Sequence, residues 1–223
     1  MATHLDLEEQ EQLDKLKHFW NTYGTLITWV LLLAAAAVVA WNGWHYYQRS
    51  QAAQAATLYD ELERATKSGE AAQVERALGD LQQRFARTAY AQQGGLLAAS
   101  SLVEKGKAEQ ARAALAWVVD KAVDPGYQAV ARLRLASMHI DAQAWDEALK
   151  QLNTGFPAEF QALAADRRGD VFLAQGKRDE ARTEYQKAWT AFAPESEYRR
   201  LVEIKLNAVG VDTKTLGAPA QQS

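Results

Sequence analysis

The stretch from residue 169 to residue 188, GDVFLAQGKRDEARTEYQKA, decides the fold of this 223-residue chain. Apolar residues recur at helical spacing on both sides of a glycine, which predicts two helices joined by a tight turn. Small residues stand at Gly169 and Ala181, and large ones at Phe172 and Tyr185. Two helices pack closely where a small residue on one faces a large residue on the other. The stretch therefore predicts a helix hairpin.

The same pattern occurs twice more upstream. Anchor alanines stand at Ala111, Ala148 and Ala181, 37 and 33 residues apart, with the extra length in the loop at 120–126. A recurrence near 34 residues predicts hairpins that stack on one another, and three are about the minimum for a stable stack. We expect the large residue four positions after each anchor to fill the space toward the neighbouring repeat. The small residues twelve positions before the anchors are Ala99, Ala136 and Gly169, and the large ones after them are Leu115, Leu152 and Tyr185.

This unit resembles the tetratricopeptide repeat in its period, its small residue, the aromatic Phe172 three positions later and the alanine twelve positions later. The tryptophan usual at the fourth position is missing from all three copies. The resemblance implies an all-α, right-handed solenoid of helix hairpins. We place this domain at residues 55–209, with 52–85 as a degenerate first hairpin, 194–209 as a closing helix and 210–223 as a flexible tail.

A second feature precedes the repeats: the segment from His18 to Gln48 contains no Asp, Glu, Lys or Arg. Its central residues, 23–41, would form about 30 Å of helix, close to the thickness of the hydrocarbon part of a bilayer. Tyrosines and tryptophans stand at both ends, as at two membrane interfaces. The segment predicts one transmembrane helix at 23–44, between a cytoplasmic leader at 1–22 and a linker at 45–54.

Two alternatives to a retained membrane helix are a cleaved signal peptide and a buried helix of a soluble core. The leader is acidic, and bulky Trp41 and Trp44 stand near the expected cleavage site, unlike the features of a signal peptide. No other segment of the chain is comparably apolar. Basic residues near the membrane number two before the helix (Lys15, Lys17) and one after it (Arg49), which favours a cytoplasmic N-terminus.

Composition and motifs argue against chemistry and against nucleic acid. The formal net charge is −3, there is no cysteine, and no basic stripe with interleaved aromatics occurs. The sequence lacks metal-ligand spacings, a phosphate loop, and a nucleophile with a base. We interpret His139 as a core histidine and Gly94-Gly95 as a site of close helix packing. We therefore expect no catalytic, cofactor or metal site, and a protein that is not an enzyme.

What remains is a surface for partners. First helices of stacked hairpins line a concave face, where we expect a mixed apolar and acidic groove suited to segments with apolar and basic groups. The alternative is that these positions only cover the solenoid. If the groove binds partners, reversing the charge of Asp166 and Asp170 should weaken partner capture without lowering the melting temperature. The expected groove residues are Leu96, Ser100, Val103 and Glu104, then Leu133, Ser137, Ile140 and Asp141, then Asp166, Asp170 and Leu173.

As a whole the chain resembles the bacterial ancillary SecYEG translocon subunit family, on the segments HFWNTYG at 18–24, WNGWHYY at 41–47 and the repeat at 169–188. The resemblance implies a single-pass protein of the inner membrane, with a cytoplasmic N-terminus and a periplasmic helical domain. It implies association with the SecYEG translocon and with a membrane-anchored periplasmic prolyl isomerase-like chaperone, assisting translocated proteins. It also implies a role in restraining a cytoplasmic stress-response regulator. No functional residue of the family transfers by position.

Three functions therefore stay open from the sequence. The first is a translocon-associated scaffold or chaperone assistant. The second is a regulator that acts through the leader at 3–18, where Leu5, Leu13 and Leu16 would form a narrow apolar stripe; the alternative is that the leader is only a solvated lead-in to the membrane. The third is an enzyme of unrecognised type. Deleting residues 1–14 separates the first two, because only the second loses its function while contacts of the helical domain survive.

Overall fold

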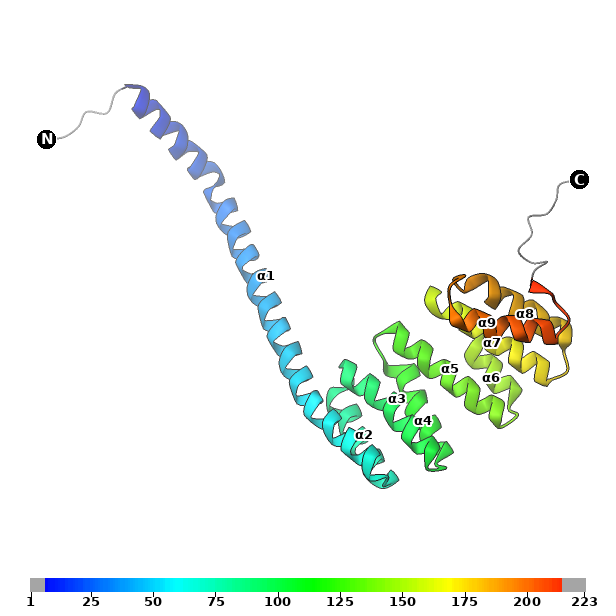
Figure 1. Cartoon of the computed structure of the whole chain (residues 1–223). Helices are drawn as coiled ribbons and strands as arrows, with labels where there is room; N and C mark the ends of the chain where they lie inside the picture. The colour runs from blue at the N-terminus through cyan, green and yellow to red at the C-terminus, as the bar shows by residue number, and fades with distance from the viewer. Residues whose placement is uncertain (1–6, 214–223) are drawn as a thin grey trace, which may run out of the picture. The chain divides into compact units, whose positions relative to one another are not determined.

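The computed structural model describes residues 7–213, with side chains from Glu11 onward, and this part is helical with no strand (Figure 1). Its contacts divide the chain into two compact units, Met1–Gln51 and Ala52–Ser223. The first helix, α1 (Leu7–Ser68), supplies the described part of the first unit and the first helix of the second. The segment expected as a linker, 45–54, is helical and belongs to α1. The first six leader residues and the tail from 214 lie outside the described residues.

The apolar part of α1 is long enough and apolar enough to cross a membrane, with a mean hydropathy of 2.1 over its most apolar 18-residue window. Its large side chains are exposed, Val39 to 71%. Polar side chains bond to the same helix: Thr28 Oγ1 donates to the Gly24 carbonyl oxygen (2.8 Å), and Asn42 Nδ2 to that of Val38 (2.9 Å). Exposed apolar and internally satisfied polar side chains are what a lipid environment requires.

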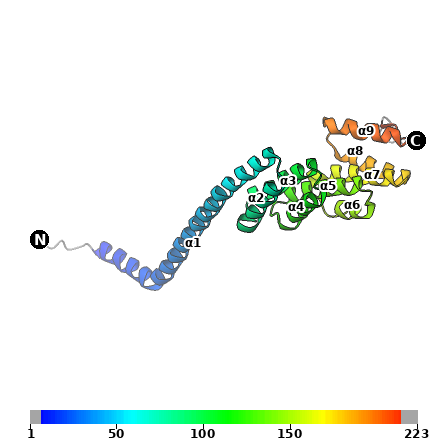
Figure 2. The same cartoon turned by 90° about the horizontal axis from the view of Figure 1, so that it is seen from below.

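The second unit is a series of helix hairpins. From α2 onward each helix packs on the next along the chain, and the first helices of the hairpins also contact one another, α3 with α5 and α5 with α7 (Figures 1 and 2). This arrangement confirms the predicted all-α repeat fold. After the end of α1 the helices are α2 (Ala71–Phe85), α3 (Ala89–Glu104), α4 (Ala108–Lys121), α5 (Pro125–Asp141), α6 (Trp145–Leu152), α7 (Ala158–Ala174), α8 (Arg178–Ala191) and α9 (Glu197–Ala208).

The turn that ends each first helix has one recurring geometry. The residue in the turn has a positive φ, a conformation that glycine adopts without the Cβ penalty. In the later turns a backbone N–H also bonds to the carbonyl five residues earlier, as from Lys177 to Phe172 (2.9 Å) and from Val211 to Leu206 (3.0 Å). The end of α1 and α9 thus finish as first helices do, so the repeat register extends to both ends. The turn residues are Gly69, Gly106, Gln143, Gly176 and Gly210.

Small residues face large ones within the hairpins, as predicted. Ala99, Ala136 and Gly169 are buried, and a Cβ added to Gly169 would collide with the Tyr185 ring. Tyr185 therefore fills the gap of its own hairpin, and it also packs in one buried cluster with Val202 and Leu206 of α9, the next helix of the stack. Its ring can lie directly against Gly169 because glycine leaves more room there than Ala99 and Ala136 leave in the earlier copies.

Gly94 and Gly95 mark a close approach between helices. A Cβ at Gly94 would lie 3.1 Å from a methyl carbon of Leu62 and 3.1 Å from one of Leu81, and a Cβ at Gly95 would collide with Val118. These contacts join α3 to the end of α1, to α2 and to α4. The packing interpretation of the glycine pair is confirmed.

Candidate functional site

The last helix covers one of the residues expected in the groove. Asp166 of α7 is fully buried (0% exposed). Its Oδ2 accepts a hydrogen bond from the Tyr198 hydroxyl (2.8 Å), and both its oxygens bind Lys205 Nζ (2.7 and 2.8 Å). Both donors belong to α9. Asp166 therefore holds α9 against α7 and presents no charge to a partner.

Asp170, one helical turn further along α7, takes part in the same cluster. Its Oδ1 accepts a hydrogen bond from the Tyr185 hydroxyl (2.8 Å), and Lys205 Nζ lies 2.7 Å from it. Arg167 Nη1 approaches its Oδ2 at 3.3 Å. We name Asp166, Asp170, Tyr185, Tyr198 and Lys205 the α9 anchor. Two carboxylates and their donors thus satisfy one another inside the domain.

The tyrosines of the α9 anchor are held neutral. Burial and the Asp166 carboxylate raise the pKa of Tyr198 to about 12. Burial and the Asp170 carboxylate raise the pKa of Tyr185 further. A phenolate beside these carboxylates would be repelled, so both hydroxyls remain donors over the whole neutral range.

The expected acidic character of the groove is therefore wrong. Of its four acidic residues, Asp166 is buried and Asp170 is half-buried in the α9 anchor, while Glu104 and Asp141 are exposed at the ends of α3 and α5. Reversing the charge of Asp166 or Asp170 would place like charges beside Lys205. Such variants would unfold α9 rather than report on partner capture.

A groove does lie on the first-helix face, between α5 and α7. It encloses about 280 Å³ and is predominantly apolar, with two arginines and one tyrosine at its polar edge. No acidic residue is among those that line it. We name it the α5–α7 groove. Its lining residues are Val130, Leu133, Arg134 and Ser137 of α5, Phe160, Leu163 and Arg167 of α7, and Tyr198 of α9.

Two of the eleven expected groove residues, Leu133 and Ser137, line the α5–α7 groove. The structure does not gather the rest into one site. Val103, Ile140 and Leu173 occupy one repeat position near the ends of their helices, and Val103 (49%) and Leu173 (37%) are exposed there. Leu96 and Ile140 are half-buried, and Ser100 is exposed.

Sequence reasoning missed six of the lining residues, although the period carried a signal for four of them. Val130 and Leu163 are 33 residues apart, and so are Arg134 and Arg167. This is the spacing of the last two anchor alanines. Equivalent positions on adjacent first helices lie side by side, so matched arginines predict two guanidinium groups on one face. Tyr198 carried no such signal, because the residue 33 positions earlier is Ala165, which does not line the groove.

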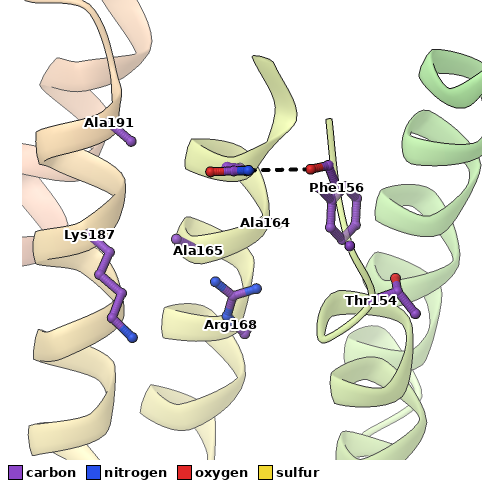
Figure 3. A pocket seen from close by; sticks show the side chains of 9 residues that line it. Thr154, Phe156, Ala164, Ala165, Arg168, Lys187 and Ala191 are labelled. Carbon is purple, nitrogen blue, oxygen red and sulfur yellow. Dashed lines mark hydrogen bonds between the residues drawn. The ribbon is translucent and has the colours of Figure 1, made fainter. Parts of the chain in front are cut away.

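A larger cavity, about 460 Å³, lies between the loop after α6, α7 and α8 (Figure 3). Arg168 of α7 and Lys187 of α8 line it, and both bind the buried Glu184, at 2.7 and 2.6 Å. Arg168 also donates to the Leu152 carbonyl oxygen (2.8 Å). Burial alone would raise the pKa of Glu184, but hydrogen bonds from Lys187 and Arg168 hold it below its usual value. These cations serve internal ion pairs that tie α6, α7 and α8 together.

Clusters of possible metal ligands were the other kind of site expected to be absent. No group of three or more His, Cys, Asp or Glu side chains in the described part of the chain is placed to hold a metal ion. His139 is half-buried rather than a core residue, and burial together with the Arg112 charge lowers its pKa. The expectation of a core histidine is wrong because the side chain is partly exposed and lies near the charges of Arg112 and Glu147.

Comparisons with known proteins agree with this architecture. The family described as the tetratricopeptide repeat-like domain matches residues 17–211. The ancillary SecYEG translocon subunit of Neisseria gonorrhoeae is 32% identical over 213 residues, covering 94% of this chain and all of the relative. The protein of the same name from Haemophilus influenzae is 28% identical over 182 residues, with 82% and 89% covered. That from Escherichia coli is 28% identical over 186 residues, with 82% and 86% covered.

Proposed function

Because this chain belongs to the ancillary SecYEG translocon subunit family, which carries a tetratricopeptide repeat-like domain, we propose that it is a membrane-anchored interaction subunit of the SecYEG translocon. The observation that carries the proposal is the match over 94% of the chain, which takes in both the apolar helix and the hairpins. An apolar helix joined to a repeat domain supports the proposal, because it would hold an interaction surface beside a membrane channel.

The apolar helix contributes by confinement. A domain tethered to the bilayer meets other membrane-bound partners at a high effective concentration, so individually weak contacts suffice for association. With two basic residues before the helix and one after it, we assign the N-terminus to the cytoplasm and the repeat domain to the periplasmic side of the inner membrane. There the domain would meet polypeptides as they leave the channel.

A membrane-anchored periplasmic prolyl isomerase-like chaperone is the second partner that we propose. A repeat domain without a reactive site assists such a process by holding polypeptide segments and passing them on. The apolar α5–α7 groove and the exposed Val103 and Leu173 supply apolar surface for that contact. Handling of newly translocated proteins is thus the role that this arrangement supports best.

Purification of the full chain from detergent-solubilised membranes tests the proposal. We expect SecY, SecE and SecG to be enriched about tenfold over a tagged, unrelated single-span protein, by quantitative mass spectrometry. A photo-crosslinker at Ser100, exposed on a first helix, should give more products than one at Thr190, exposed on a second helix. Equal recovery of the translocon with the unrelated protein would refute the association.

A regulatory role of the leader is the second candidate. In its described part α1 is helical, and Leu13 and Leu16 are exposed to 45% and 63%, so both are accessible to a cytoplasmic partner. Leu5 lies outside the described residues. Deleting residues 1–14 should leave translocon recovery unchanged and abolish control of a stress-response regulator, if this role exists. Unchanged stress-regulated transcription in the deletion strain would reject it.

A further inference from the structure

The α5–α7 groove has a charge opposite to the acidic character that the sequence predicted for the groove. Its two charged lining residues are arginines. Arg134 is exposed, and one of its guanidinium nitrogens donates to the Leu96 carbonyl oxygen at 2.9 Å, a neutral partner. No ion pair is formed by Arg134 among the described side chains. Its remaining N–H donors face solvent.

Arg167 lies one repeat further and is partly engaged. It reaches Asp170 at 3.3 Å, while Lys205 binds the same carboxylate more closely, at 2.7 Å. Lys205 and Arg167 together balance Asp166 and Asp170, so this cluster is neutral as a whole. The positive charge of Arg134 remains uncompensated, which leaves the groove with a net attraction for anions.

The rest of the groove is apolar and limited in size. Val130, Leu133, Phe160 and Leu163 form its walls. About 280 Å³ is at or below the size of typical small-molecule sites, roughly 300–1,000 Å³. The space suits a few side chains of a longer segment rather than an enclosed ligand.

We propose that the α5–α7 groove captures polypeptide segments in which an acidic side chain is flanked by apolar ones. Arg134 and Arg167 bind the carboxylate, because guanidinium groups offer paired N–H donors that match its two oxygens. The apolar walls take the flanking side chains. This inference rests on the proposed function, and it names the class of segment that the repeat domain holds.

Binding of two matched peptides tests the selectivity. Each is a fluorescein-labelled 12-residue peptide with two central positions between leucines, and these positions are glutamate in one and glutamine in the other. The full chain in zwitterionic lipid nanodiscs should bind the glutamate peptide about tenfold more tightly by fluorescence anisotropy, after subtraction of binding to empty nanodiscs. The ratio should shrink as salt is raised, because exposed charges are screened.

Variants assign the preference to the groove. Arg134→Gln should reduce the ratio of the two affinities to near one, Arg134→Lys should retain part of it, and Arg134→Glu should favour a lysine version of the peptide. Arg76→Gln, which removes an exposed arginine on α2, is the matched control and should leave the ratio unchanged. Leu163→Ser should weaken both peptides equally.

Three results would overturn the inference: equal affinity for the glutamate and glutamine peptides, an unchanged preference in Arg134→Gln, and no binding of either peptide. Recovery of SecY, SecE and SecG is measured on the same variants, so the two proposals fail separately. Full translocon recovery without a preference for the glutamate peptide would reject the proposed role of the groove and leave the proposed translocon association standing. A preference for the glutamate peptide without translocon recovery would reject the translocon association and support the proposed role of the groove.

Discussion

The first hairpins and the last helix of the repeat domain are held in place by different forces. From the end of α1 to α5 the buried cluster consists of leucines, valines, alanines and one phenylalanine, with small residues opposite large ones. At α9 an apolar cluster is joined by the α9 anchor, in which Lys205 and Tyr198 bind buried or half-buried carboxylates. Apolar contacts favour any arrangement that fills the available space, whereas the hydrogen bonds and ion pairs of the α9 anchor also fix the orientation of α9 on α7.

This difference follows from the position of α9 in the repeat. Each earlier first helix is clamped by its own second helix, but α9 has none among the described residues. Seven residues before the turn, where α3, α5 and α7 carry Ala99, Ala136 and Gly169, α9 carries Glu203. Its carboxylate accepts a hydrogen bond from Thr213 (2.6 Å). At α9, hydrogen bonds and an ion pair from Tyr198 and Lys205 to Asp166 of α7 hold the helix in place.

Removing the cation of the α9 anchor should have the largest effect. Lys205→Met leaves Asp166 buried without its ion pair, and breaking one partner of a buried pair costs about 3–5 kcal/mol. Urea unfolding of the full chain in detergent micelles, followed by circular dichroism, measures the loss. Hydrogen exchange should rise first in α9.

A surface lysine provides the matched control. Lys187 binds Glu184, but its side chain is 58% exposed and Arg168 remains to pair with the carboxylate. Lys187→Met should therefore cost less than about 1 kcal/mol. If both lysine variants lost the same stability, the anchor would not differ from a surface ion pair, and the contrast between α9 and the other helices would fail.

Crowding the small-residue position should have the next largest effect. Gly169→Ala places a methyl group against the Tyr185 ring, and overpacking of this kind costs about 1–3 kcal/mol. Gly79→Ala on α2 is the control, since nothing lies within 4 Å of the added carbon there. It should gain about 0.5–1 kcal/mol from helix propensity. Unfolding midpoints that move the same way in both variants would contradict the packing argument.

The sequence predicted the hairpins well because their determinants are local and repeated. The glycines at most of the turns, the small residues at the gaps and the apolar spacing recur at about 33 to 37 residues, so the pattern of one copy helps to identify the others. Gln143 shows the limit of composition: it takes the same turn conformation as the glycines, with φ 56°. The period predicts that conformation where the residue type does not.

The site was predicted less well, for a physical reason. Whether Asp166 faces a groove or a neighbour depends on where α9 packs, and that is fixed by contacts from residues 32 and 39 positions away. Spacing within α7 carries no information on those contacts. The repeat spacing could have predicted the pair Arg134 and Arg167, because equivalent positions on neighbouring first helices lie on the same face of the domain.

The smallest expected effect is that of one hydroxyl in the α9 anchor. Tyr198→Phe removes the hydrogen bond to Asp166 and should cost about 1 kcal/mol near pH 7. The pKa of Tyr198 is raised to about 12 by burial and by the Asp166 carboxylate, above the ordinary value of 10.0. Its contribution to stability is therefore complete below pH 10 and is lost as the pH rises toward about 12.

Unfolding of the natural chain and of Tyr198→Phe should consequently converge in alkali. The difference in their free energies of unfolding should be largest near pH 7 and should shrink by about pH 11, because the unfolded natural chain gains an ionised tyrosine that phenylalanine cannot supply. A difference that stayed constant across this interval would mean that the hydroxyl is not held neutral by the carboxylate. The directional part of the anchor would then rest on Lys205 alone.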